Sequence, residues 1–421
     1  MENTLDFDSE LWELAAAVEA GARMRFDEIA MVAEQNTQRV LAAFRSERVS
    51  DSHFAGTSGY GYNDSGRETL DRVYARVFAA ESAIVRVSIA NGTHAIAAAL
   101  YAALSPGDVL LSATGEPYDT LRSTIGIGEA EAKHGSLAHY GVKYREVGIT
   151  PEGVPDFDGI HEAILRSNGA VRAVFVQRSR GYSTRRALSM REIARIARIA
   201  HDIDESIAVI VDNCYGEFTE PLEPCAVGAD LIAGSLIKNP GGGLAPAGGY
   251  IAGRSGLVER AAERLTVPGV GSEVGATLGQ NRLLFQGLFM APHTVGQALR
   301  AMVLCAGMLK ELGYETSPGA LDNRSDIIQM VRLGSLDAMR RFCQGIQSGS
   351  PIDSFVTPEP WLMPGYSDPV IMAAGTFVQG SSIELSADGR AVAPYDVYLQ
   401  GGLSYESAKI GILSALSSLR R

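Results

Sequence analysis

Residues 231–243 read Leu-Ile-Ala-Gly-Ser-Leu-Ile-Lys-Asn-Pro-Gly-Gly-Gly, an apolar run that leads into a lysine and a glycine-rich turn. The apolar part predicts a buried strand over 231–236, and the proline and glycines end that strand in a turn. Lys238 therefore follows a buried strand. A lysine is costly to bury unless it is paired or neutral, and a partly desolvated lysine has the lowered pKa that Schiff-base chemistry needs. The alternative is a solvated lysine at a strand end.

The same apolar pattern recurs on both sides of this run, where it alternates with segments of helical periodicity. Buried strands are expected at residues 83–89, 109–113, 142–147, 171–177, 207–213, 231–236 and 249–252. Helices are expected between them, for example at residues 93–104, 156–167 and 189–204. This alternation predicts an α/β fold in which helices cover both faces of a sheet.

Three parts of the chain differ in their pattern. Residues 1–55 carry apolar side chains at helical spacing and predict an N-terminal helical arm. Residues 56–300 contain the strand-like runs and form the expected large domain. Residues 301–421 are expected to form a smaller C-terminal α+β domain, which the chain reaches through a long apolar segment at 288–312. The elements expected in this smaller domain are strands at 370–374 and 382–385 and a helix at 405–419.

The composition argues against several classes of protein. With 37 basic and 49 acidic residues the chain has a formal net charge of -12, so the electrostatic footprint of a nucleic-acid-binding protein is missing. No apolar stretch reaches the roughly 20 residues of a membrane-spanning helix, and the acidic start lacks the basic region of a signal peptide. Cytoplasm is therefore the expected location. The four cysteines show no metal-ligand spacing, so no metal site is expected.

Three further segments place polar groups where expected strands end, which is where ligands collect in open α/β sheets. Asp212 ends an apolar run, and an aspartate there can keep a pyridine nitrogen protonated. Asn91, Gly92 and Thr93 begin an expected helix, whose backbone N–H groups and Thr93 hydroxyl can hold a phosphate. Tyr118 follows another strand and can stack on a planar ligand. Each residue alone has a commoner explanation, as a turn aspartate, an ordinary helix start or a core tyrosine.

The order of these segments is more specific than any one of them. A phosphate cradle, a stacking tyrosine, a strand-end aspartate and a Ser-x-x-Lys motif follow one another along the chain, and together they supply the groups that a site for pyridoxal 5'-phosphate (PLP) needs. The cradle lacks the GxGxxG and GxxxxGK[ST] patterns, so a dinucleotide or nucleotide site is not supported.

Nine separated stretches form recognisable motifs: Gly59-Tyr-Gly-Tyr-Asn-Asp-Ser-Gly-Arg67, Gly92-Thr-His-Ala-Ile96, Pro117-Tyr-Asp-Thr-Leu121, Gln177-Arg-Ser-Arg-Gly-Tyr182, Val211-Asp-Asn-Cys-Tyr-Gly-Glu217, Ser235-Leu-Ile-Lys-Asn-Pro-Gly-Gly-Gly243, Gly287-Leu-Phe-Met-Ala-Pro292, Pro358-Glu-Pro-Trp-Leu-Met-Pro-Gly365 and Ser382-Ile-Glu-Leu-Ser-Ala-Asp388. In these stretches the chain resembles the methionine γ-lyase-like family, often called aluminium-resistance proteins, a branch of the Cys/Met-metabolism PLP enzymes. The resemblance extends over nearly the whole chain.

The resemblance implies the PLP-dependent transferase-like fold, known as fold type I, with a seven-stranded sheet in the large domain. It implies that Lys238 binds the cofactor covalently and that Asp212 pairs with its pyridinium. It also implies that Tyr118 stacks on the ring and donates a proton to the leaving group. The residues expected to contact the phosphate are Asn91, Gly92, Thr93 and Ser235.

Tyr60 resembles a tyrosine that relatives extend across a subunit interface to a neighbour's phosphate. Tyr62 stands where relatives often have an arginine, so the second phosphate contact expected from the neighbour differs here. This likeness implies a homodimer or homotetramer with shared active sites.

Two departures from the family pattern concern the substrate. Asn91 replaces a usual serine before Gly-Thr-His, and Arg390 stands two positions before the place of the usual arginine in Gly-Pro-Ile-Arg. Arg390 is therefore one candidate for binding the substrate carboxylate, because a planar guanidinium can grip it with two hydrogen bonds. Arg178 and Arg180 are further candidates for binding an anion, although both also fit a surface position.

The expected activity is γ-elimination from a small amino acid, as in a methionine γ-lyase or a cystathionine lyase. One alternative is a dehydrohalogenase that removes halide from a γ-chloro unsaturated amino acid and leaves an alkyne of the propargylglycine type. An aminotransferase would share Lys238 and Asp212 but would need a 2-oxo acid acceptor. A non-catalytic PLP-binding protein is the last alternative.

Overall fold

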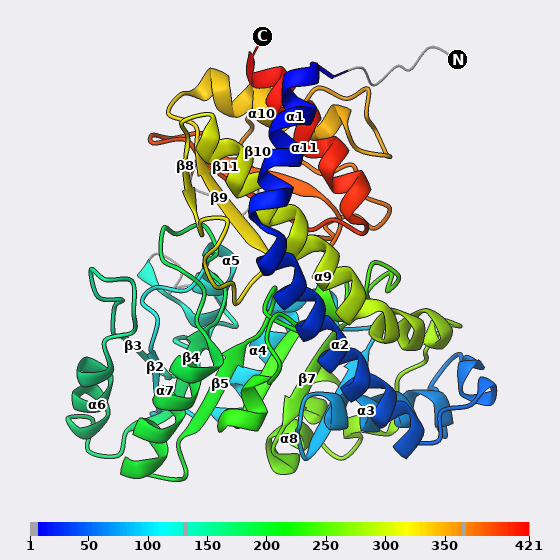
Figure 1. Cartoon of the computed structure of the whole chain (residues 1–421). Helices are drawn as coiled ribbons and strands as arrows, with labels where there is room; N and C mark the ends of the chain where they lie inside the picture. The colour runs from blue at the N-terminus through cyan, green and yellow to red at the C-terminus, as the bar shows by residue number, and fades with distance from the viewer. Residues whose placement is uncertain (1–6, 129–133, 364–367, 421) are drawn as a thin grey trace.

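The computed structural model describes residues 7–128, 134–363 and 368–420. Two sheets, one in each lobe of the chain, are joined by a long helix (Figure 1). Within the described residues, every helix is too short or too polar to cross a lipid bilayer.

The larger sheet has seven strands in the order β1-β7-β6-β5-β4-β2-β3, which confirms the predicted number. Strands β2 to β6 run parallel, whereas β7 is antiparallel to both of its neighbours. Because parallel strands end at the same edge, the residues that follow β4, β5 and β6 lie close together. The strands are β1 Ser82–Arg86, β2 Val109–Ser112, β3 Lys143–Glu146, β4 Val171–Gln177, β5 Ala208–Asp212, β6 Leu231–Ser235 and β7 Gly249–Gly253.

Side chains from this sheet enter two separate hydrophobic clusters, one on each face. In β5, Val209 and Val211 belong to one cluster and Ala208 and Ile210 to the other, as the alternation of a strand requires. The first face is covered by α3 Ser65–Val77, α6 Phe157–Leu165 and α7 Met190–Ile203. The second face is covered by α4 Gly92–Ala103, α5 Asp119–Ile125 and α8 Ser255–Leu265.

The second sheet lies in the C-terminal lobe and is antiparallel throughout, in the order β10-β11-β12-β9-β8. The predicted strand at 382–385 is wrong. These residues form bends, since the Glu384 carboxylate accepts the backbone N–H groups of Phe377 and Val378, and the strand begins at Ser386. The elements are β8 Glu315–Ser317, β9 Ile328–Arg332, α10 Leu336–Ser348, β10 Val370–Ala373, β11 Ser386–Arg390, β12 Asp396–Gln400 and α11 Tyr405–Arg420.

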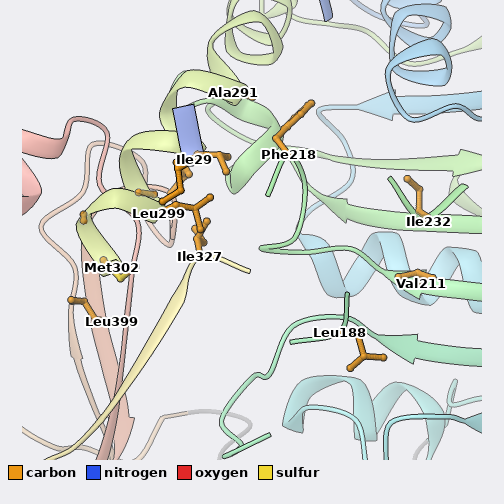
Figure 2. Packing of buried hydrophobic residues seen from close by; sticks show 14 of the residues in the cluster. Ile29, Leu188, Val211, Phe218, Ile232, Ala291, Leu299, Met302, Ile327 and Leu399 are labelled. Atoms are coloured by element: carbon orange, nitrogen blue, oxygen red, sulfur yellow. The ribbon is translucent and has the colours of Figure 1, made fainter. Parts of the chain in front are cut away.

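Helix α9, Asn281–Glu311, connects the two lobes without a break. The proposed domain boundary at residue 300 therefore falls inside a continuous helix. The N-terminal helices α1 Ser9–Gly21 and α2 Arg23–Ser46 lie against α9 and span both lobes (Figure 1), and a short helix, η1 Asp51–Phe54, follows them. Figure 2 shows Ile29 of α2, Leu299 of α9 and Ile327 together in one cluster, so a single core joins the lobes.

The turn after Lys238, η4 Asn239–Gly241, contacts α9, and the two backbones come close together there. A Cβ atom on Gly287 would lie 2.3 Å from the carbonyl oxygen of Gly241, and one on Gly242 would lie 2.4 Å from the carbonyl oxygen of Gly287. Gly242 also has a φ of +54°, which favours glycine. These glycines allow α9 to approach the segment that carries Lys238.

We expect Gly287→Ala to lower the free energy of unfolding by about 1–3 kcal/mol, because its methyl group would collide with backbone that cannot rotate away. Thermal unfolding of the purified variant measures this effect. The matched control is Gly256→Ala in α8, where no atom lies within 4 Å of the added Cβ and alanine favours the helix. Equal melting temperatures for the two variants would contradict the proposed role of the contact.

Candidate functional site

A cavity of about 420 Å³ lies at the carboxyl edge of the larger sheet, between this sheet and the C-terminal lobe. The large lobe contributes polar groups that follow its strands, and the small lobe contributes side chains of β10, β11 and β12. The cavity residues used below are Asn91, Gly92, Thr93, Tyr118, Asp119, Tyr182, Asp212, Cys214, Tyr215, Ser235, Lys238, Met372, Asp388, Tyr398 and Gln400.

Lys238 reaches this cavity from the end of β6, and its Nζ lies 3.9 Å from the centroid of the Tyr215 ring. Burial opposes a charge on this amine, but Cys214, Tyr215 and Asp212 outweigh burial and raise the pKa of Lys238 well above its usual value. This direction is opposite to the one predicted from burial alone. Burial also raises the pKa values of Cys214 and Tyr215, so Asp212 is the carboxylate among these neighbours of Lys238.

Asp212 is the last residue of β5 and lies beside Gln177 of β4 and Ala233 of β6 in the sheet. Its carboxylate accepts the backbone N–H of Cys214 at 3.1 Å. Burial raises the pKa of Asp212, and the nearby Lys238 opposes this rise. A buried carboxylate in this position favours a cationic ligand group.

The start of α4 and the end of β6 form one wall of the cavity. The Ser235 hydroxyl is buried and has no hydrogen-bond partner among the described residues. A Cβ atom on Gly92 would lie 3.1 Å from the Cys214 sulfur, so the backbone at the helix start is tightly packed. Asn91 uses its side chain to accept the backbone N–H of His94 at 2.8 Å, which caps α4. Free N–H groups of a helix start and an unpartnered hydroxyl suit an anion such as phosphate.

Tyr118 lies at the start of α5, where its backbone N–H donates to the Gln177 side chain at 3.0 Å. Its hydroxyl lies 3.0 Å from the hydroxyl oxygen of Thr93. Burial, together with the charge of Asp212, raises the pKa of Tyr118 well above its usual value. The hydroxyl therefore keeps its proton at neutral pH and is held in a fixed direction.

Tyr60 and Tyr62 lie outside the cavity of their own chain. Their side chains are 78% and 57% exposed, and their ring centroids are 5.9 Å apart. The loop that carries them is nevertheless held firmly, because the buried Arg67 donates to the carbonyl oxygens of Gly61 and Gly275 at 2.6 and 2.9 Å. The loop thus presents two aromatic rings to the outside on a rigid base.

The three predicted arginines are placed differently from one another. Arg178 is fully buried, and its guanidinium binds Asn213 at 2.8 Å and Glu220 at 3.1 Å, so the structure does not bring it to the cavity. Arg180 is buried too. It donates to the Ser317 carbonyl oxygen at 2.8 Å, whereas its Nε and Nη2 have no partner among the described residues. Arg180 does not line the cavity, although both of its sequence neighbours do.

Arg390 lies beside the cavity rather than in its lining. Its guanidinium pairs with Asp119, the first residue of α5, and lies 5.7 Å from the centroid of the Tyr182 ring. The ion pair therefore joins the small lobe to the large lobe next to the cavity. Arg390 is close enough to the cavity to stay a candidate for binding the substrate carboxylate. Asp119 already neutralises part of its charge.

Several residues that line the cavity were not predicted from the sequence: Tyr182, Cys214, Tyr215, Asp388, Tyr398 and Gln400. The first four belong to motifs quoted for the family resemblance, so their presence in those motifs was a usable signal. Tyr398 and Gln400 lie outside every quoted motif. They reach the cavity only because β12 lies beside β11 in the small sheet.

Known proteins resemble this chain along almost its whole length. A family model described as methionine gamma-lyase matches residues 11–420. The YnbB protein of Bacillus subtilis is 47% identical over 419 residues, which cover 100% of this chain and 99% of that protein. The crystal structure of a carbon-sulfur lyase involved in aluminium resistance from Clostridium novyi NT is 48% identical, with a TM-score of 0.94 over 98% of this chain and 96% of that one.

A more distant solved structure shares the fold. The PLP-dependent protein YhfS from Escherichia coli is 17% identical, with a TM-score of 0.61 over 92% of this chain and 96% of that one. The predicted fold type I architecture is therefore confirmed. From the match along almost its full length, the chain belongs to the methionine γ-lyase family.

Proposed function

We propose that this chain is a PLP-dependent carbon–sulfur lyase that acts on a small amino acid by γ-elimination. The observation that carries the proposal is the convergence of Lys238, Asp212, Tyr118 and the Ser235 hydroxyl on one cavity. These groups come from segments far apart in the sequence, and each suits a different part of the cofactor. The Clostridium novyi relative is named a carbon-sulfur lyase, which favours a thiolate as the leaving group.

The residues present fit PLP. Lys238 would bind the cofactor, Asp212 would pair with its pyridinium, and Tyr118 would lie on its ring. The start of α4 at Gly92 and Thr93 would hold the phosphate together with Ser235, whose buried hydroxyl otherwise lacks a partner. PLP supplies an electron sink that stabilises negative charge at the α-carbon of an amino acid.

The side chains then have separate tasks in the elimination. The Lys238 amine would move protons at the α- and β-carbons, since it lines the cavity. The Tyr118 hydroxyl, which its raised pKa keeps protonated and Thr93 orients, would donate its proton to the departing sulfur. With one added water, a thioether amino acid gives a thiol, ammonia and a 2-oxo acid.

Other activities have less support. The dehydrohalogenase alternative would use the same residues, but neither the cavity nor the relatives described above favour a halide. An aminotransferase would keep the amino group on the cofactor until a 2-oxo acid accepts it, and so would not release ammonia. Assaying thiol, halide, 2-oxo acid and ammonia together separates these activities.

We expect the purified enzyme to release thiol, 2-oxo acid and ammonia in equal amounts from a γ-thioether amino acid. Lys238→Ala should abolish this release, because no other amine lines the cavity among the described residues. Lys310→Ala, a change in the last turn of α9, is the matched control and should retain activity. Halide release without thiol release in an amino-acid panel would overturn the proposal.

Arg390 is proposed to contact the substrate carboxylate at the edge of the cavity. Arg390→Ala should lower kcat/KM roughly 30- to 1000-fold, equivalent to about 2–4 kcal/mol, because a charge-assisted contact is lost. Arg390→Lys should not restore the rate, since a single ammonium cannot make the two-pronged contact. Values within a few-fold of wild type would show that another group, such as Arg180, holds the carboxylate.

We also propose a homodimer or homotetramer in which Tyr60 completes the site of a neighbouring chain. The exposed Tyr60 and Tyr62 support this proposal, because the buried Arg67 fixes the backbone of their loop by hydrogen bonds. A loop that contacts only solvent would not require such a fixed conformation. Tyr60→Phe and Lys238→Ala should each be inactive alone. Mixed and reassembled, they should regain part of the wild-type activity, since a hybrid contains one intact site. Full activity of Tyr60→Phe alone would contradict a shared site.

A further inference from the structure

The small lobe forms its wall of the cavity from side chains that are neighbours across three strands. Met372 of β10 lies opposite Asp388 of β11, which lies opposite Tyr398 of β12. All three residues line the cavity. The wall therefore places one carboxylate between a thioether and an aromatic ring.

The cavity lining contains more acidic than basic side chains. Its lining contains the carboxylates of Asp119, Asp212 and Asp388, but Lys238 is the one lysine among the lining residues, and none of them is an arginine or histidine. Asp119 is paired with Arg390, and Asp212 lies near Lys238. Among the described residues, no ion pair includes Asp388.

The direct contacts of Asp388 are neutral. Its carboxylate accepts hydrogen bonds from Tyr182 and, at 3.4 Å, from the side-chain amide of Gln400. The rings of Tyr182 and Tyr398 lie beside it with centroids 5.3 Å apart, and electron-rich rings attract cations. Burial raises the pKa of Asp388 to about 7, against the influence of Tyr182, Lys238 and Gln400. A carboxylate in such a place is stabilised by a cation that enters the cavity.

We propose that Asp388 is a specificity-determining residue that binds a second, distal ammonium group of the substrate. The enzyme then prefers thioether amino acids that carry an amino group at both ends over those, such as methionine, that end in a plain alkyl group. The reaction rests on the proposed lyase function, whereas the cation site is a binding property that can be measured separately.

The test compares ligands that have no γ-leaving group, by calorimetric titration of the purified holoenzyme. L-Lysine and L-ornithine are titrated beside 2-aminoheptanoate and norleucine, in which a methyl group replaces the terminal ammonium. We expect at least one diamino acid to bind about tenfold or more tightly than its methyl counterpart. Using two chain lengths allows for the distance between Asp388 and the bound α-amino group.

Asp388→Asn keeps the shape of the side chain and removes its charge. In this variant, each diamino acid should bind about as tightly as its methyl counterpart, so that the ratio of the two affinities is close to one. Asp396→Asn is the matched control, because it removes a carboxylate of the same small sheet that pairs with Arg332 and does not line the cavity, and it should leave the ratios unchanged. Equal binding of both ligand types to the wild-type protein overturns the proposal, and this comparison needs no variant. Unchanged ratios in Asp388→Asn overturn it as well. Failure to release thiol would refute the lyase function but not these ratios.

Discussion

The contact between the turn at Asn239–Gly241 and helix α9 is the constraint on which the rest of the structure depends. Two backbones meet there with no room for a Cβ atom, so Lys238 is held by the main chain on either side of it. The same helix extends into the small lobe and supports the N-terminal helices. One glycine contact thus relates Lys238, the two lobes and the N-terminal arm.

The two walls of the cavity have different chemical characters. The large-lobe wall offers a lysine, a helix start and an unpartnered hydroxyl, which suit a phosphorylated ring. The small-lobe wall offers a carboxylate, an amide and the aromatic ring of Tyr398, which suit the free end of an amino-acid substrate. The wall proposed to hold the cofactor and the wall proposed to face the substrate therefore belong to different sheets.

The large sheet was predictable from sequence because strands buried on both faces appear as continuous apolar runs. Strand β11, which reads Ser-Ala-Asp-Gly-Arg, has no such run, since its exposed face lines a polar cavity, and the prediction was displaced to 382–385. Lys238 and Asp212 were predictable as strand-end groups, but the direction of the lysine pKa depends on neighbours that the sequence does not place. The position of Arg178 away from the cavity was not predictable for the same reason, because its partner Glu220 lies 42 residues further along the chain.

The lobes are linked in two unlike ways. At the rear, helix α9 and the apolar core around it form a link that dissolved ions barely affect. Beside the cavity, one of the polar links is the pair between Arg390 and Asp119, whose side chains are 34% and 18% exposed. Mobile ions screen attraction between charges that solvent can reach. Rising ionic strength therefore weakens the pair beside the cavity and leaves the apolar core around α9 almost unchanged.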